Sequence, residues 1–200
     1  MGLIGLTGGI STGKTTVANY LSQTYSVPLW DADVYAREAV KPGSPILDQL
    51  VNRYGSTILL KGGQLNRQQL GQIIFHNDTE RHWVEAQIHP FVRDRFSQNI
   101  TQFQQQKTRN TAVLVIPLLF EAQMSNLVTE IWVVYCSPQQ QLSRLMQRHP
   151  GSLTLEQAVA RIESQMPLSE KCQQADVILD NSNTLEMLFQ QVDAAFKSLR

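Results

Sequence analysis

The residues with the clearest chemical pattern are the glycines, the lysine and the hydroxyl side chains of "GGISTGKTT", at 8–16. Gly8, Gly13, Lys14 and Thr15 complete the pattern G-x-x-x-x-G-K-[S/T] of a phosphate-binding P-loop. The glycines let the backbone curl until its N–H groups converge on phosphate oxygens, and the following helix presents its positive end to the same anion. We therefore predict a bound nucleoside triphosphate, with Lys14 between the β and γ phosphates and the Thr15 hydroxyl as a Mg²⁺ ligand.

Two carboxylates follow in the segment "WDADVYARE". Asp31 and Asp33 close the strand-like run that begins at Val27, and we expect this strand beside the first one. Because they stand two apart on an extended segment, both should point toward the γ-phosphate. Asp33 is our candidate for the base that accepts the acceptor's proton, and Asp31 should orient the site or hold Mg²⁺ through water. A pair of helix-capping or turn aspartates is the alternative.

Arginines on a later helical pair favour phosphoryl transfer. Arg144 and Arg148 are four residues apart and therefore share a face of one helix, and Arg161 follows on the next. A mobile lid could bring their guanidinium groups onto the charge that develops during transfer and could exclude water. Each of these arginines could instead be an exposed helix cation.

Other nucleotide-binding classes lack support in the sequence. A G-x-G-x-x-G segment is absent, so a Rossmann dinucleotide site is not predicted. An Asn-Lys-x-Asp segment and an Asp-x-x-Gly segment after a strand are also absent, which argues against a GTPase switch.

The elements that must position these groups follow an α/β pattern. Several strand-like runs are apolar throughout, which is typical of a parallel sheet with helices on both faces. The runs lie at 3–7, 27–33, 112–120, 131–136 and 176–180. We predict an α/β fold with a P-loop kinase-like parallel sheet flanked by helices.

Helical spacing fills the stretch between the second and third runs, and its length suits a helical substrate-binding insertion. Thr154 followed by Gln157 is a capping box, which predicts a helix from about Leu155. The whole chain is predicted to be one P-loop kinase domain. Its expected parts are a core at 1–60, 109–137 and 170–200, an acceptor-binding insertion at about 61–108 and a lid at about 138–169.

The amino-acid composition limits the classes of binding partner that we expect. The chain has 17 basic and 17 acidic side chains, so no global field draws it to nucleic acid or to an anionic membrane. The sequence shows neither a leader nor a run long enough for a membrane span, so we expect a cytoplasmic protein. Cys136 and Cys172 lack a Cys-x-x-Cys pattern, and we expect buried or inert thiols. We make no prediction of the oligomeric state.

Several segments together resemble the dephospho-coenzyme A kinase family, in the family's order and from residue 3 to about 183. "DAD" at 31–33, "IHP" at 88–90 and "PLLFE" at 117–121 are together far more specific than the P-loop. The resemblance implies ATP-dependent phosphorylation of the ribose 3′-hydroxyl of dephospho-coenzyme A, the last step of coenzyme A synthesis. The expected cofactors are ATP and Mg²⁺.

The resemblance, together with the motifs described above, predicts the site residues. Asp33 matches the proposed base, Arg144 matches a lid arginine that faces the phosphates, and Lys14 completes the predicted catalytic set. ATP should be held by Gly8, Gly9, Ser11, Thr12, Gly13, Lys14, Thr15 and Thr16, with Arg148 on the lid and Asn181 near adenine. The acceptor should be held by Asp31, Arg67, His89, Arg93 and Glu121, and Mg²⁺ by Thr15 and Asp31.

Some of these assignments have alternatives. His89 could cap a helix or fill the edge of a core, and Glu121 could orient another side chain instead of the acceptor. The family usually has "GGIGSGKS", so Ser11 replaces a loop glycine, at a cost of about 1 kcal/mol or more if that position needs a positive φ. We expect altered loop dynamics from Ser11, with binding retained.

Two other functions stay open at this point. One is another small-molecule kinase, acting on a nucleotide or a shikimate-like acceptor. The other is a nucleotide-gated binding module without transfer activity.

Overall fold

The structure, a computed structural model, describes residues 2–75, 77–105, 111–148, 150–151 and 153–199. The chain divides into two compact units. The sheet unit comprises Met1–Asp31 and Phe103–Arg200, and the helical unit comprises Ala32–Gln102.

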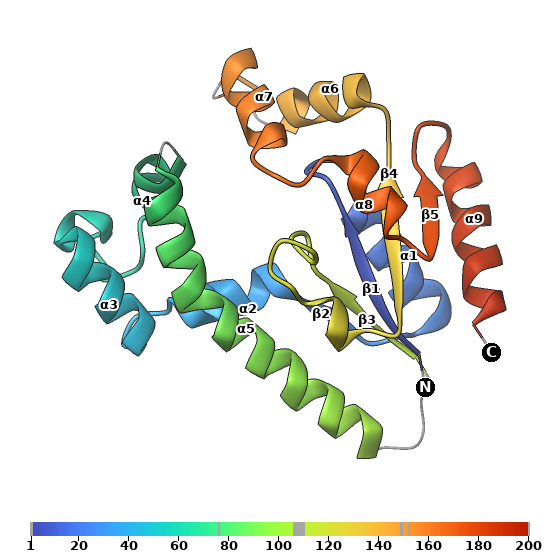
Figure 1. Cartoon of the computed structure of the whole chain (residues 1–200), viewed down its shortest axis with the longest axis horizontal. Coiled ribbons are helices and arrows are strands. Elements are labelled where there is room, and N and C mark those ends of the chain that lie inside the picture. The colour runs from blue at the N-terminus through green and yellow to red at the C-terminus, as the bar shows by residue number, and fades with distance from the viewer. Residues whose placement is uncertain (1, 76, 106–110, 149, 152, 200) are drawn as a thin grey trace. The chain divides into compact units, whose positions relative to one another are not determined.

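The sheet unit is built on five parallel strands in the order β2-β3-β1-β4-β5 (Figure 1). The predicted α/β class and parallel sheet are confirmed. The strands are β1 (Gly2–Gly8), β2 (Leu29–Asp31), β3 (Thr111–Val115), β4 (Glu130–Tyr135) and β5 (Val177–Asp180).

Three features of the sheet differ from our expectation. The second strand is short, because the backbone turns into helix α2 (Ala32–Ala39) directly after Asp31. It pairs with β3, which separates it from β1, so its predicted place beside the first strand was wrong. The third strand ends at Val115, and the apolar residues after it form turns instead of strand.

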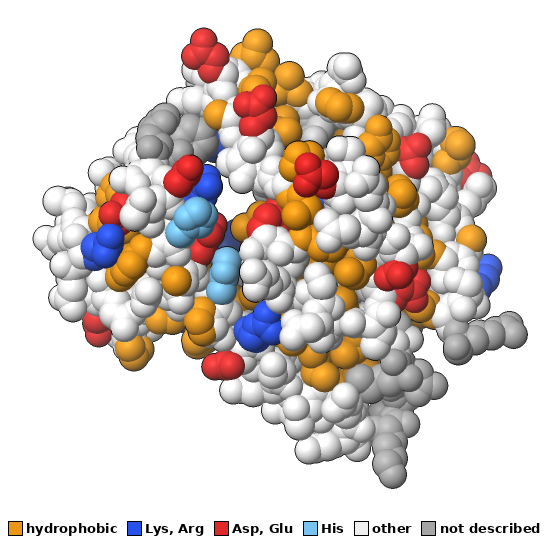
Figure 2. All heavy atoms as spheres, viewed as in Figure 1, with side chains coloured by type: hydrophobic (Ala, Val, Ile, Leu, Met, Phe, Trp, Pro, Cys, Tyr) orange, Lys and Arg blue, Asp and Glu red, His pale blue; other side chains and the backbone are white. Residues whose placement is uncertain are grey.

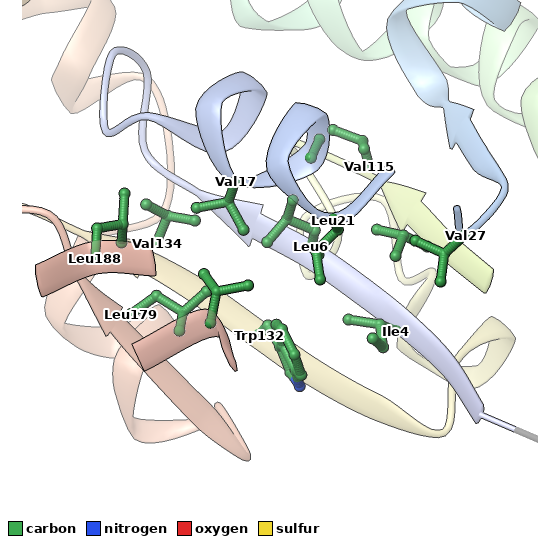
Figure 3. Close-up of a cluster of buried hydrophobic side chains, with 13 residues drawn as sticks. Ile4, Leu6, Val17, Leu21, Val27, Val115, Trp132, Val134, Leu179 and Leu188 are labelled. Atoms are coloured by element: carbon green, nitrogen blue, oxygen red, sulfur yellow. The ribbon is translucent and has the colours of Figure 1, made fainter. Parts of the chain in front are cut away.

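One face of the sheet is covered by α1 (Lys14–Tyr25) and α9 (Leu185–Ser198). Apolar side chains from both helices and from four strands meet in a single buried cluster, and the fully buried Trp132 lies within it (Figure 3). The hydroxyls of Tyr20 and Tyr25 each donate to Asp193 at 2.8 Å, which joins the two helices. This packing fixes α1, and therefore the loop that leads into it.

The other face carries the loop after β3 and the short helix α8 (Leu168–Gln173), which packs on β4. Lys171 on α8 is fully buried, and its Nζ lies 2.8 Å from Glu121 Oε1 and 3.0 Å from the Pro117 carbonyl oxygen. Glu121 also accepts a hydrogen bond from the Met166 backbone N–H at 2.9 Å. A buried ammonium group thus holds the "PLLFE" turn against the end of the lid.

Replacing this lysine should destabilise the sheet unit. In Lys171→Met, the Pro117 carbonyl oxygen loses its donor and the exposed Glu121 loses its counter-charge, so we expect the free energy of unfolding to fall by about 1 to 2 kcal/mol. Urea denaturation followed by circular dichroism measures the change. Lys197→Met, at an exposed position of α9, is the matched control. Equal losses in the two variants would show that the Lys171 pair does not support the fold.

Two helices form the region predicted as a lid: α6 (Pro138–Arg148) and α7 (Leu155–Glu163). The capping box is confirmed, with Thr154 N to Gln157 Oε1 at 3.1 Å and Gln157 N to Thr154 Oγ1 at 3.2 Å. Ala158 is buried among apolar residues of both helices, whereas Leu155 is exposed.

The helical unit contains α2, α3 (Pro45–Tyr54), α4 (Arg67–Phe75) and most of α5 (Asp78–Gln105). It begins at Ala32, whereas the sequence placed the insertion at about 61–108, because α2 and α3 pack against the later helices. Tyr35 of α2 stacks edge-on against Phe96 at 5.1 Å and accepts a hydrogen bond from Asn99, and Glu38 pairs with Arg95 at 2.8 Å.

The surface agrees with the zero net charge. On the face shown in Figure 2, acidic and basic side chains lie scattered among polar and apolar ones. None of the helices, as far as the structure describes them, is long and apolar enough to cross a membrane.

Cys136 is buried and Cys172 is half-buried, and both are free thiols. Burial raises the pKa of each thiol. The expectation of inert thiols is therefore supported.

Candidate active site

The P-loop connects β1 to α1, and its glycines are required by space and by backbone angle. Gly8 has φ 142° and Gly13 has φ 109°, both outside the range that L side chains readily adopt. A Cβ on Gly8 would lie 2.5 Å from the Val134 carbonyl oxygen, and one on Gly13 would lie 2.2 Å from Asn181 Nδ2. Only glycine therefore fits at these two positions.

The start of α1 is suited to an anion. Gly13 is its N-cap residue and provides no side-chain cap, and the first turn holds no acidic side chain. The positive end of the helix dipole is therefore not neutralised by the helix itself. Lys14 adds a positive charge at the same place, since its Nζ lies 3.0 Å from the Gly8 carbonyl oxygen and 2.7 Å from that of Gly9.

Ser11 adopts the left-handed conformation, with φ 60°. The position does need a positive φ, which is the condition on which the predicted cost of the glycine replacement depended. Ser11 is also buried, and its hydroxyl has no hydrogen-bond partner in the part of the chain that the structure describes. Both the backbone strain and the unpaired hydroxyl should cost stability.

Ser11→Gly should stabilise the protein. Loss of the strain and of the buried hydroxyl outweighs the extra backbone freedom of glycine, and we expect a gain of about 1 to 2 kcal/mol in the free energy of unfolding. Chemical denaturation measures it. Ser26→Gly is the control, because Ser26 has φ 53° but is exposed, so its gain should be smaller. A Ser11→Gly protein that unfolds at lower denaturant than the wild type would contradict this account.

A pocket of about 320 Å³ lies beside the P-loop, entirely within the sheet unit. It brings together six of the residues predicted to act on the nucleotide or its phosphates, and two others. The lining residues are Ser11, Gly13, Thr16, Arg144, Arg148 and Asn181, with Gln147 and Leu185. Arg161, which we also considered for the lid, is exposed on α7 and is absent from this lining.

Arg144 and Asn181 connect the lid, the end of β5 and the P-loop. An Arg144 Nη2 proton is donated to the Asn181 carbonyl oxygen at 2.9 Å, and Asn181 Nδ2 donates to the Thr12 carbonyl oxygen at 2.8 Å. Asn181 is buried, so its amide supports the loop as well as lining the pocket. The guanidinium of Arg144 is thus held by the end of β5, in the same pocket lining as the P-loop residues Ser11 and Gly13.

Two glutamines that the sequence analysis missed hold the P-loop from the lid side. Gln141 Nε2 donates to the Ile10 carbonyl oxygen at 2.9 Å, and the Ile10 N–H donates to Gln165 Oε1 at 2.9 Å. Both backbone groups of Ile10, next to the strained Ser11, are therefore paired. A neutral side chain in a glutamine-rich sequence gave no signal of this role.

The two aspartates do not share one extended segment, contrary to our prediction. Asp31 ends β2 in the sheet unit, and Asp33 lies in the first turn of α2 in the helical unit. A carboxylate is favourable in a first helical turn, so the helix-terminal alternative describes where Asp33 lies. Asp33 is exposed, and its role as a base stays a prediction.

The metal site also stays a prediction. Among the described residues, no group of three or more His, Cys, Asp or Glu side chains could enclose a metal ion. Mg²⁺ in kinases commonly uses few protein ligands together with phosphate oxygens, and the exposed Thr15 hydroxyl in the first turn of α1 fits such a ligand.

The residues predicted to hold the acceptor lie on two units. Arg67 begins α4, and His89 and Arg93 are one turn apart on α5. Burial lowers the pKa of His89, and the positive charge of Arg93 lowers it further while Glu85 raises it. His89 should therefore be neutral at neutral pH. Glu121 holds Lys171, which is the second of the two roles predicted for it.

Comparison with known proteins identifies the family. The model of the family described as dephospho-CoA kinase matches residues 2–187. This chain belongs to the dephospho-CoA kinase family. Members of this family catalyse the final step of coenzyme A biosynthesis, and they are kinases that use ATP.

The similar proteins are named for the same activity. Dephospho-CoA kinase of Trichormus variabilis is 62% identical over 96% of this chain and 95% of its own length, and that of Synechocystis sp. is 56% identical over 97% and 94%. The solved structure of dephospho-CoA kinase from Campylobacter jejuni has a TM-score of 0.72 at 26% identity, covering 98% of this chain and 96% of that one. A shikimate kinase from Bacteroides thetaiotaomicron, 14% identical with a TM-score of 0.54, shares the fold.

Proposed function

We propose that this chain transfers the γ-phosphoryl group of ATP to the ribose 3′-hydroxyl of dephospho-coenzyme A, giving coenzyme A and ADP. The observation that supports this most is the dephospho-CoA kinase family match over residues 2–187, together with relatives of that name at 56% and 62% identity. The pocket beside the P-loop would hold ATP, because its lining includes P-loop residues and two arginines.

The phosphates of ATP would be held by the backbone N–H groups of the P-loop and by Lys14. The positive end of α1 and the ammonium of Lys14 stabilise negative charge on the β and γ phosphates. Arg144 would place its guanidinium on the phosphoryl group during transfer, where it stabilises the developing charge. Mg²⁺, with Thr15 and Asp31 as its proposed ligands, would neutralise phosphate charge when bound.

Asp33 would accept the proton of the attacking 3′-hydroxyl. Arg67, His89 and Arg93 would hold the acceptor, and a neutral His89 would do so through a hydrogen bond instead of a charge. Arg148 and Asn181, which line the pocket, would contact the nucleoside part of ATP. A cytoplasmic location also stays a prediction.

ADP release with a panel of acceptors tests the proposal. The purified chain is supplied with MgATP and with dephospho-coenzyme A, shikimate, a nucleoside monophosphate or no acceptor. We expect ADP formation with dephospho-coenzyme A, and ³¹P NMR should show one new phosphomonoester per ADP. Turnover with the nucleoside monophosphate or shikimate alone would favour another kinase of this fold. ATP binding without turnover of any acceptor would favour a binding module.

A further inference from the structure

A second pocket, of about 300 Å³, lies entirely within the helical unit, at the end of α2 and beside the start of α4. Three of its side chains are basic and the rest are polar or apolar. The lining residues are Arg37, Lys41 and Arg67, with Val40, Pro42, Leu60, Gln64 and Leu65. No acidic residue is in this lining. Its only sequence-predicted member is Arg67.

The walls of this pocket are held by the fold. Val40 and Leu65 are buried members of the apolar core of the helical unit, so they form a fixed floor. The turn after α2 is closed by a hydrogen bond from Ser44 N to the Lys41 carbonyl oxygen at 3.0 Å. Another part of the lining is a small hairpin, closed by a hydrogen bond from Leu60 N to the Gln64 carbonyl oxygen at 2.8 Å. The backbone that carries the basic side chains is therefore held by the fold itself, without a bound ligand.

Two positive charges of the pocket, those of Arg37 and Arg67, are close enough to repel one another. Burial lowers the pKa of the Arg67 guanidinium, the charge of Arg37 lowers it further, and the charge of Asp33 acts in the opposite direction. Glu38, next to Arg37 on α2, is already paired with Arg95 at 2.8 Å. Gathering like charges is unfavourable unless an anion joins them, and guanidinium groups bind phosphate oxygens in bidentate fashion.

We propose that Arg37, Lys41 and Arg67 bind the diphosphate of dephospho-coenzyme A, which deepens and rests on the function proposed above. A diphosphate diester carries two negative charges and several oxygens, enough for three cationic side chains. The apolar surface of Pro42 and Leu60 suits the start of the pantetheine arm. In this acceptor the diphosphate is attached to the 5′-oxygen of the same ribose that carries the 3′-hydroxyl. Anchoring it beside Arg67 holds that ribose near Asp33, whose charge reaches Arg67.

Binding and kinetics of charge-removing variants test the site. Arg37→Gln and Lys41→Gln each remove one charge-assisted contact, so we expect the Kd and KM for dephospho-coenzyme A to rise about 10- to 100-fold. The Kd for ATP should change by less than about twofold, because the P-loop pocket lies in the other unit. Isothermal titration calorimetry, with each ligand added alone, gives the two Kd values.

Lys61→Gln is the matched control, since Lys61 is an exposed lysine of the same hairpin that is absent from the pocket lining. The salt dependence provides a readout that a structural role would not move. The Kd of the wild type and of Lys61→Gln for dephospho-coenzyme A should rise with ionic strength, and less steeply in the two pocket variants. Circular dichroism checks that all variants are folded.

An unchanged affinity for dephospho-coenzyme A in both pocket variants would overturn this inference, even if the wild type is an active dephospho-coenzyme A kinase. An equal loss of affinity in Lys61→Gln would also overturn the inference, because the affinity would then depend on the net charge of the protein and not on the pocket. A wild type that does not phosphorylate dephospho-coenzyme A, whatever its affinity, would instead refute the proposed function.

Discussion

Asp33→Asn is expected to lower kcat by about 10² to 10⁴, the range for loss of a general base. The amide keeps the size and the hydrogen-bonding shape of the side chain, but it cannot accept the proton of the 3′-hydroxyl. The Kd for ATP should be unchanged, because Asp33 lies outside the sheet unit that holds the P-loop pocket. Steady-state kinetics with saturating acceptor, and calorimetry with ATP, measure the two quantities.

A control is needed because Asp33 lies in the first turn of α2, where a carboxylate also favours the helix. Asp48 also lies in a first helical turn, that of α3, and is exposed. Asp48→Asn should therefore lose a similar helix-dipole contribution while kcat changes by less than about twofold. If Asp33→Asn also leaves kcat unchanged, Asp33 is a helix-terminal residue only and another group must accept the proton.

Local sequence patterns predicted the parts of the site that depend on local backbone chemistry. The P-loop glycines are required by their φ angles and by the atoms around them, and the positive φ of Ser11 follows from the same curl of the chain. The capping box at Thr154 is satisfied within three residues. In each case the backbone angles or the capping hydrogen bonds are set within a few residues, so neighbouring residues are enough to predict them. The close approach of Val134 to Gly8 and of Asn181 to Gly13 comes from distant segments and was not predicted.

Features that depend on contacts between distant segments were not predictable in this way. The order of the strands places β3 between β1 and β2, and β3 lies about eighty residues after β2 in the sequence. The start of a helix at Ala32 separates Asp31 from Asp33, although "WDAD" reads equally well as strand. The partners of the buried Lys171 ammonium, the Glu121 carboxylate and the Pro117 carbonyl oxygen, come from another part of the chain.

The basic pocket of the helical unit also depends on contacts between segments that are distant in the sequence. Arg37 lies on α2 and Lys41 in the turn after it, and our sequence analysis assigned neither of them a role. Their relation to Arg67 appears only when the hairpin around Leu60 and Gln64 folds beside them. Of the three basic residues in this pocket, the family resemblance predicted only Arg67. It assigned roles by matching sequence motifs, and a motif does not show which other residues lie nearby in the fold.

Lys14→Ala should lower kcat by about 10² to 10³ and weaken ATP binding by about 10- to 100-fold. The ammonium group lies within hydrogen-bonding distance of the Gly8 and Gly9 carbonyl oxygens, so its charge is held where the P-loop curls. Its removal takes away both the attraction to bound phosphates and the charge that stabilises transfer. Calorimetry with ATP and single-turnover kinetics separate the two effects.

Lys197→Ala, an exposed lysine of the same unit, should leave both values within about twofold of the wild type and serves as the control. The two catalytic variants then differ in kind. Asp33→Asn should affect turnover alone, because a base acts only on the acceptor's proton, whereas Lys14→Ala should affect binding and turnover together, because phosphate charge is present before and during transfer. Full retention of ATP affinity in Lys14→Ala would show that the loop binds phosphate through its backbone without the ammonium group. Arg144 would then be the main cationic side chain at the nucleotide site.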